Sequence, residues 1–182
     1  HRKRCVDRIF ARFMDQRKIC NEPSVTRGQP TNKNVDGPNS INNSGTISAN
    51  VAGIWLNTNS LISGSVNNNG TISGNLAGIA LLGSTITGGI TNTSNIGNPV
   101  TSGSMGIGLY GGSVTGSITN SGTISSNVVG ITLDTASTIS GSITNDGTIF
   151  GNTAVDIRRG SSVTNSIANN AAGTITGSSA AI

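Results

Sequence analysis

The chain has 182 residues, of which only 10% are charged and 3% are aromatic, and glycine occupies 26 positions. Its net charge of +4 arises in residues 1–40, because residues 41–182 hold two arginines against three aspartates. This long, nearly neutral part has no basic stripe to release phosphate counterions, so the composition excludes a nucleic-acid partner, and the single histidine argues against histidine-based catalysis.

Residues 1–20 form a basic leader that predicts one short amphipathic helix. Its apolar residues follow the i, i+3, i+4, i+7 spacing of a helix face and are Val6, Ile9, Phe10 and Phe13. Such a helix would cap the open end of a repeat structure, and the alternative is a disordered leader without a structural role. Residues 21–40 are rich in Asn, Pro and Gly, which indicates a linker.

Residues 41–182 consist of self-similar units, which we divide into residues 41–65, 66–89, 90–117, 118–142, 143–166 and a partial unit, 167–182. The shared pattern is I-x-N-x-G-T-I-S-x-N-x-x-G-I-x-L, followed by S-x-I-x-G-x. Each apolar segment is short, β-branched and bounded by Gly, Asn or Ser, and none has the 3.6-residue spacing of a helix. The units therefore predict strands joined by turns.

Aliphatic residues recur at fixed offsets in these units and form four columns. The first column is Ile41, Val66, Ile90, Ile118, Ile143 and Ile167, and the second is Ile47, Ile72, Ile96, Ile124, Ile149 and Ile175. A meander of hairpins would not need this strict repetition, whereas in a parallel β-helix each unit is one coil and identical residues stack about 4.8 Å apart. We therefore predict an all-β fold, a parallel β-helix (solenoid) of about five and a half coils with three short strands each.

Two series of asparagines repeat with the same period. The first is Asn43, Asn68, Asn92, Asn120, Asn145 and Asn169, and the second is Asn50, Asn75, Asn98, Asn127 and Asn152. Asn tolerates the left-handed backbone of corners, and its amide can hydrogen-bond its copies above and below. The glycines at the first corner, which we expect to be there for the same backbone reason, are Gly45, Gly70, Gly122 and Gly147. We interpret both series as structural.

The third unit departs from the pattern through an insertion at residues 98–105, which contains Pro99. Insertions in solenoids map to loops on one face, often the binding face, although a tolerated surface loop is the alternative. Trp55 and Tyr110 are expected to point outward, and an aromatic ring can serve as a platform for a sugar. The candidate binding surface is therefore the face that bears Trp55, Tyr110 and Pro99.

The charged groups that remain for chemistry are Asp134, Asp146, Asp156, Arg158 and Arg159. Polysaccharide-cleaving enzymes need clustered carboxylates or an arginine base on one face. Asp134 and Asp156 fall in adjacent coils but in different columns, so we predict that the chain is not an enzyme and uses no cofactor or metal. A polysaccharide-binding or polysaccharide-cleaving β-helix is kept as the alternative.

A second alternative is an ice-binding solenoid, which would use a flat ladder of threonines. A T-x-S column is present at Thr46/Ser48, Thr71/Ser73, Thr123/Ser125 and Thr174/Thr176. Asn95 and Gly97 interrupt this column in the third unit, and Phe150 interrupts it in the fifth.

The repeat closely resembles the passenger repeats of autotransporters, the type V secreted proteins of Gram-negative bacteria. The segments NNNGTISGNLAGIAL (67–81) and ITNSGTISSNVVGITL (118–133) carry the resemblance best, and it covers residues 41–182. The resemblance implies a right-handed parallel β-helix that is exported through a C-terminal β-barrel translocator. Neither that barrel nor a signal peptide occurs in these residues, so we expect a fragment or a processed piece of a longer protein.

From this resemblance we expect a structural stalk or adhesin at the cell surface or outer membrane, or secreted, that mediates adhesion or autoaggregation. The expected partners are ligands on host cells, matrix or neighbouring cells, glycans among them. Repetition would multiply weak contacts, so that avidity exceeds the affinity of a single contact.

Overall fold

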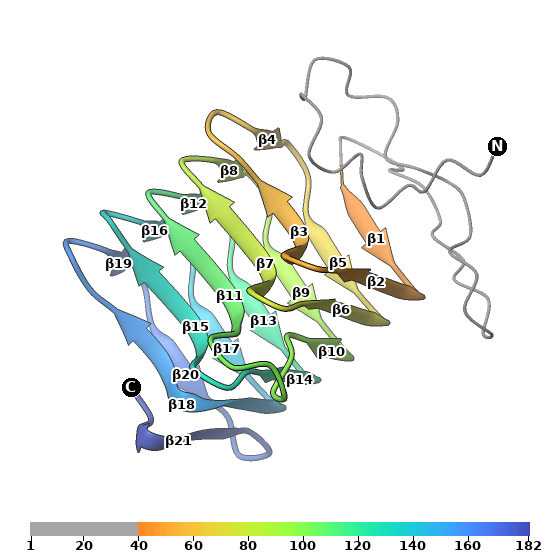
Figure 1. The fold of residues 1–182 in the computed structure, drawn as a ribbon. Helices are drawn as coiled ribbons and strands as arrows, with labels where there is room; N and C mark the ends of the chain where they lie inside the picture. The colour runs from red at the N-terminus through yellow and green to blue at the C-terminus, as the bar shows by residue number, and fades with distance from the viewer. Residues whose placement is uncertain (1–39) are drawn as a thin grey trace, which may run out of the picture.

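The structure, a computed structural model, describes residues 40–182, and every regular element in this part is a β-strand. The predicted leader (1–20) and residues 21–39 of the predicted linker lie outside the described residues. Equivalent strands of successive coils pair in parallel, which forms a β-solenoid of about six turns (Figure 1). The predicted all-β parallel solenoid is confirmed.

The first sheet contains one strand from each coil. Its strands, in order, are β1 (Ile41–Asn43), β5 (Val66–Asn68), β9 (Ile90–Asn92), β13 (Ile118–Asn120), β17 (Ile143–Asn145) and β20 (Ile167–Asn169). The pairing follows the sequence repeat, since Ile118 pairs with Ile90 on one side and with Ile143 on the other. Each sequence unit therefore begins with a strand of this sheet.

The second sheet is bent at a corner and contains two rows of strands. The first row is β2 (Thr46–Ala49), β6 (Thr71–Gly74), β10 (Asn95–Ile96) and β14 (Thr123–Ser125). The second row is β3 (Ala52–Leu56), β7 (Ala77–Leu82), β11 (Met105–Tyr110) and β15 (Val129–Asp134). In the fifth coil β18 (Thr148–Ile157) runs through the corner and joins the rows, and β21 (Thr174–Ala180) pairs with it.

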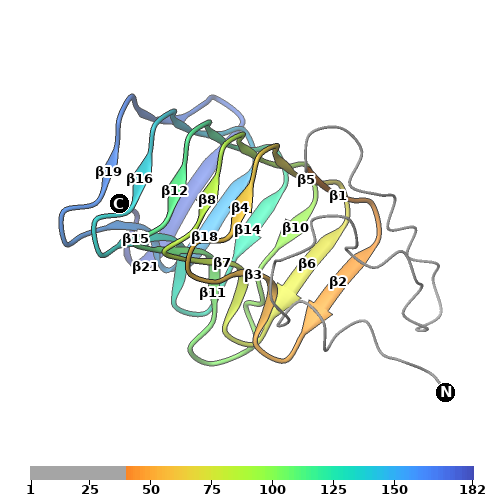
Figure 2. The same ribbon diagram turned by 90° about the horizontal axis from the view of Figure 1, so that it is seen from above.

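The third sheet is formed by two-residue strands. They are β4 (Leu61–Ile62), β8 (Thr85–Ile86), β12 (Ser113–Val114), β16 (Thr138–Ile139) and β19 (Ser162–Val163). Each of the first four coils therefore has four strands, and the expectation of three strands per coil is wrong. The fourth strand arises because the corner between the two rows divides the part of the second sheet in each of these coils into two strands. Figure 2 shows equivalent strands following one another along the axis.

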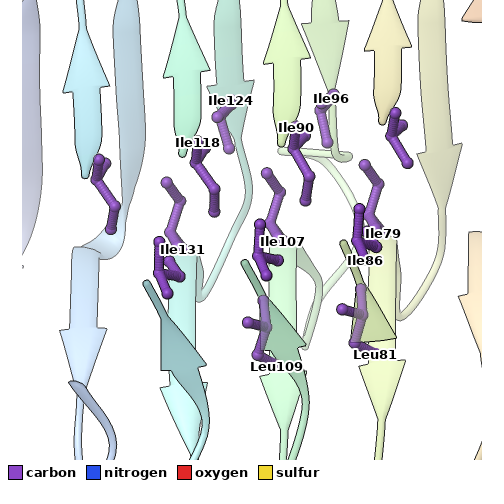
Figure 3. Packing of buried hydrophobic residues seen from close by; sticks show 14 of the residues in the cluster. Ile79, Leu81, Ile86, Ile90, Ile96, Ile107, Leu109, Ile118, Ile124 and Ile131 are labelled. Atoms are coloured by element: carbon purple, nitrogen blue, oxygen red, sulfur yellow. The ribbon is translucent and has the colours of Figure 1, made fainter. Parts of the chain in front are cut away.

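The core is a continuous column of aliphatic side chains inside the coils. The side chains of Ile72, Ile96 and Ile124, which stack in register on β6, β10 and β14, are fully buried. Figure 3 shows that such residues from neighbouring coils point into the same narrow interior. Burial of each aliphatic side chain contributes about 1.5–3 kcal/mol before the entropy of ordering the coil is subtracted.

The first asparagine series forms the predicted ladder inside the corner after the first sheet. Each Nδ2 donates to Oδ1 of its copy in the next coil, from Asn43 through to Asn169, at distances of 2.7–2.8 Å. The same amide also bonds the backbone of its own corner; for example, Asn68 Nδ2 donates to the Gly70 carbonyl and its Oδ1 accepts from the Gly70 N–H. The ladder thereby satisfies buried polar groups that would otherwise destabilise a thin core.

The second series does not form such a ladder, because no hydrogen bond joins one of its members to another within residues 40–182. Asn98 instead donates to Thr101 in the inserted loop, and Asn152 accepts from Ser178 and Ser179. Within this part of the chain, members of the second series therefore bond other residues and not one another.

The glycines of the first corner have a different reason from the one expected. Neither they nor the ladder asparagines are among the residues with positive φ in the described part of the chain. A Cβ on Gly70 would instead overlap the carbonyl oxygen of Gly45, and one on Gly147 that of Gly122. Stacked backbones therefore leave little room for a side chain at these glycines, although the third coil has Ser94 at the equivalent position.

Candidate binding surface

The second row of the second sheet provides the widest outer face of the solenoid. Strands β7, β11 and β15 are six residues long, and the register places Trp55, Ala80, Gly108, Thr132 and Asp156 in one outward column. Because side chains alternate along a strand, the residue two positions later in each coil points outward too. That second column brings Leu82, Tyr110 and Asp134 side by side.

Large apolar side chains lie over small residues in the first three coils of this face. Ala52, Ala77 and Ala80 form a buried floor, and the side chains packed against it are Trp55, Leu82 and Met105. We call Trp55, Leu82, Met105 and Tyr110 the platform. The three alanines allow Trp55, Leu82 and Met105 to pack close to the backbone, and all four platform side chains are half-buried although they lie outside the core.

Tyr110 lies along its own strand. Its hydroxyl is 2.9 Å from Met105 Sδ, five residues earlier. A Cβ on Gly108, between them, would be 3.2 Å from Tyr110 Cε2 and 3.6 Å from Met105 Sδ. The absence of a side chain at Gly108 therefore gives the tyrosine ring room to lie against the sheet.

A group of charged residues adjoins the platform in the fourth and fifth coils. We call Asp134, Asp156, Arg158 and Arg159 the charged border. Asp134 Oδ2 is 3.0 Å from Arg158 Nε and 3.2 Å from Arg159 Nη1, and Arg158 Nη1 is 3.3 Å from Asp156 Oδ2. The Asp134 side chain is only 2% exposed, whereas Arg159 is 72% exposed. A buried carboxylate thus orients two arginines that reach into solvent.

The turns next to the charged border have unusual backbone conformations. Thr135, Ala136 and Arg159 have φ values of 58°, 56° and 50°, a region that favours glycine. Asp134 Oδ1 accepts the Thr135 N–H at 2.7 Å, and the Ser137 hydroxyl donates to the Asp134 carbonyl at 2.6 Å. Asp134 therefore holds both its own strained turn and the arginines of the next coil.

The electrostatics of the face depend on these contacts. Burial alone would raise the pKa of the Asp134 carboxyl, but the Thr135 N–H and the two arginines hold it below the ordinary value. The pKa of Tyr110 is raised, mainly by burial, and Arg158, Asp134 and Asp156 all act on it. The tyrosine and the charged border therefore form one electrostatic group.

The structure places Trp55 and Tyr110 on one outer face, two coils apart. Pro99 is exposed in the loop that precedes β11, whereas Tyr110 is the last residue of β11. This loop is fixed at the opposite end of the strands, where Ser104 Oγ donates to the Asn98 carbonyl and accepts from the Asn127 N–H. The loop and the two aromatic residues are therefore separate features.

The charged border is a grouping that the sequence patterns did not reveal. Asp134 and Asp156 do lie in adjacent coils and different columns, but Arg158 bridges them. The consecutive arginines in the coil after Asp134, one repeat length away, are the available sequence signal. Asp146 lies elsewhere, exposed, and accepts from Asn170.

The threonine column is in register along the first row of the second sheet. The column contains Thr46, Thr71, Thr123, Thr148 and Thr174, and Asn95 occupies its position in the third coil, between Thr71 and Thr123. Ser73 Oγ donates to Ser48 Oγ at 3.3 Å. Phe150, which is 40% exposed, interrupts the neighbouring column as expected.

Residues 40–182 contain no group of three His, Cys, Asp or Glu side chains that would hold a metal ion. Over the same residues there is no helix with the length and apolarity of a membrane crossing. No protein-family model, curated protein or solved structure matches the chain.

Proposed function

We propose that residues 41–182 are a stalk segment of a cell-surface or secreted protein of the autotransporter type, and that the segment mediates adhesion or autoaggregation. The observation that carries the proposal is the repetition of outward polar residues in register. On the first sheet, Asn42, Asn67, Thr91, Thr119 and Thr144 form one such outward column. Each coil therefore offers a similar set of weak hydrogen-bonding groups, and avidity along the axis adds to each single contact.

The core and the asparagine ladder support the mechanical part of the proposal. Both run from coil to coil without interruption, also through the third coil with its inserted loop. A continuous core keeps the outer columns in line, which multivalent contact requires. The proposed partners are ligands on host cells, matrix or neighbouring cells.

We infer that this segment is not an enzyme. Asp134 is buried and paired with two arginines, and Asp156 shares Arg158 with it. A general acid or base must reach the substrate, and a carboxylate with a lowered pKa is a weak base. Incubation with polysaccharides is expected to yield no shortened chains, and cleavage that Asp156→Asn abolishes would reverse this inference.

The test of the adhesive role is display of the full-length protein on a non-adherent bacterium. In one variant, residues 66–117 are replaced by two copies of unit 118–142, which keeps the number of coils and changes the surface. In a second variant, residues 66–117 are deleted, which shortens the stalk. Adhesion that the replacement keeps and the deletion reduces supports repeated contacts along the axis, loss in both variants supports a specific adhesive surface on residues 66–117, and unchanged adhesion in both contradicts the proposal for these coils.

Ice binding is a second candidate, because the threonine column is aligned in five of the six coils. Inhibition of ice recrystallisation by the soluble chain is the measurement that decides it. Activity that Thr71→Leu removes, and that Thr119→Leu on the first sheet leaves intact, would favour this candidate over adhesion.

A further inference from the structure

We propose that the outer face of β3, β7, β11, β15 and β18 binds a neutral glycan chain that lies along the solenoid axis. Sugar rings would stack on Trp55 and Tyr110, and sugar hydroxyls would bond to Asp156, Arg158 and Arg159. The proposal names a ligand class for the adhesive role, and its biological meaning rests on that role.

Aromatic residues are concentrated on this face. Residues 40–182 contain three aromatic side chains, and two of them, Trp55 and Tyr110, lie on this face. They are two coils apart, a separation of about 10 Å along the axis at the spacing of paired strands. Apolar C–H faces of sugar rings pack on such large rings, whose polar ends can bond hydroxyl groups.

The charges of the charged border are balanced. Two aspartates and two arginines cancel, so the face has no net charge to attract an ion. Asp156 is an acceptor that is 24% exposed, and the exposed Arg158 and Arg159 are donors. A hydroxyl group both donates and accepts, so neighbouring sugar hydroxyls match this pair, whereas an anion would approach Asp156 unfavourably.

The face contains a buried hydroxyl, that of Thr132, without a hydrogen-bond partner in the described residues. Thr132 is 1% exposed, and its Oγ1 makes no hydrogen bond within the described residues. It lies in the outward column between Gly108, under the tyrosine ring, and Asp156 in the charged border. Buried polar groups are nearly always paired, so an orphan here indicates a place for a water or a ligand hydroxyl.

The polar groups of the charged border are held in place by contacts within the protein. Asp134 fixes both arginines from beneath, and the strained turns at Thr135 and Arg159 persist because of these contacts. Groups fixed in advance lose less entropy on binding. Strained backbone of this kind is concentrated at functional sites.

The test is a titration of the full chain with neutral hexasaccharides, namely cellohexaose, xylohexaose, mannohexaose and laminarihexaose, followed by calorimetry or NMR shifts. At least one is expected to bind, with an affinity that changes less than about twofold between low and high salt, because no counterions are released. Trp55→Ala and Tyr110→Ala are each expected to weaken binding by about tenfold or more, the scale of a lost aromatic contact.

Matched variants separate binding from folding. Tyr110→Phe keeps the ring and is expected to bind within about threefold of the parent. Phe150→Ala removes an exposed aromatic residue from another part of the sheet and is expected to leave binding unchanged. Circular dichroism of each variant verifies the fold, and Asp156→Asn, which keeps the size, tests the polar contacts.

The acidic oligosaccharide tetragalacturonate is titrated in parallel. Three results would overturn the inference: no binding of any neutral hexasaccharide, binding of tetragalacturonate alone, or binding that Trp55→Ala and Tyr110→Ala leave unchanged. The displayed protein then distinguishes this inference from the adhesive role. Glycan binding by a displayed protein that does not adhere contradicts the role and keeps the site. Adhesion without glycan binding contradicts the site and keeps the role.

Discussion

Asn68 Nδ2 donates a 2.7 Å hydrogen bond to Oδ1 of Asn92, which is the same position one coil later. The bond is repeated between every pair of coils and always runs in the same direction. Each amide also bonds the backbone of two coils, since Asn68 Nδ2 reaches the carbonyls of Gly70 and Asn95. The ladder therefore couples the coils through buried polar contacts as well as through the isoleucine columns.

Replacement of one rung tests this coupling. Asn92→Ala is expected to lower the free energy of unfolding by about 1–3 kcal/mol, because it leaves its buried neighbours without partners. Thr91→Ala, at the exposed neighbouring position of β9, is the control and is expected to change it by less than about 0.5 kcal/mol. Urea unfolding measures both, and equal effects would contradict a structural ladder.

The inward register is tested by two adjacent positions of β14. Ile124→Asp places a charge in a dry column without a partner and is expected to unfold the middle coils. Thr123→Asp, which points outward, is expected to cost less than about 1 kcal/mol. Far-UV circular dichroism is the measurement, and a similar loss of β signal in both variants would mean that the register is wrong.

Close stacking at the first corner predicts a strong effect of one methyl group. Gly147→Ala is expected to destabilise the chain by about 1–3 kcal/mol, because the added Cβ overlaps the Gly122 carbonyl in the neighbouring coil and the backbone must shift. Gly103→Ala is the contrasting change: its φ of 85° is strained, but no atom lies within 4 Å of the added carbon. A cost of about 1 kcal/mol is expected there, and thermal unfolding of both variants provides the comparison.

The lowered pKa of Asp134 predicts a dependence of stability on acid. Its folded pKa lies below the unfolded value of about 3.9, so the ion-paired carboxylate stabilises the fold above that pH. This contribution is lost as the pH falls through the folded pKa. The parent chain is therefore expected to lose more stability than Asp134→Asn between pH 6 and pH 2, by chemical unfolding. A parallel decline would show that the ion pairs do not stabilise the fold.

The repeat alone was enough to predict the all-β solenoid and the first asparagine ladder. This is because pairing of identical units requires Ile72, Ile96 and Ile124 to stack, and strand alternation then decides which neighbours point inward. The number of strands per coil was not predictable from the repeat. In the first coil the strand ends at Ala49 and a new strand begins after the corner, whereas in the fifth coil β18 continues through the equivalent corner. The reason for the corner glycines was missed as well, because contact between stacked backbones is not a property of one unit.

The outward direction of Trp55 and Tyr110 was visible in the sequence, but their surroundings were not. Tyr110 lies against its strand because Gly108 and Met105 leave room and a contact for it. The charged border depends on contact between Arg158 and Asp134 in adjacent coils. This contact requires the register of β15 and β18 and the shape of the turns after them. The sequence by itself therefore determined the repeating architecture, in which every position follows from its copies. Only the tertiary structure decided which residues meet in the candidate binding surface, because that surface consists of the residues that differ from coil to coil and meet only after stacking.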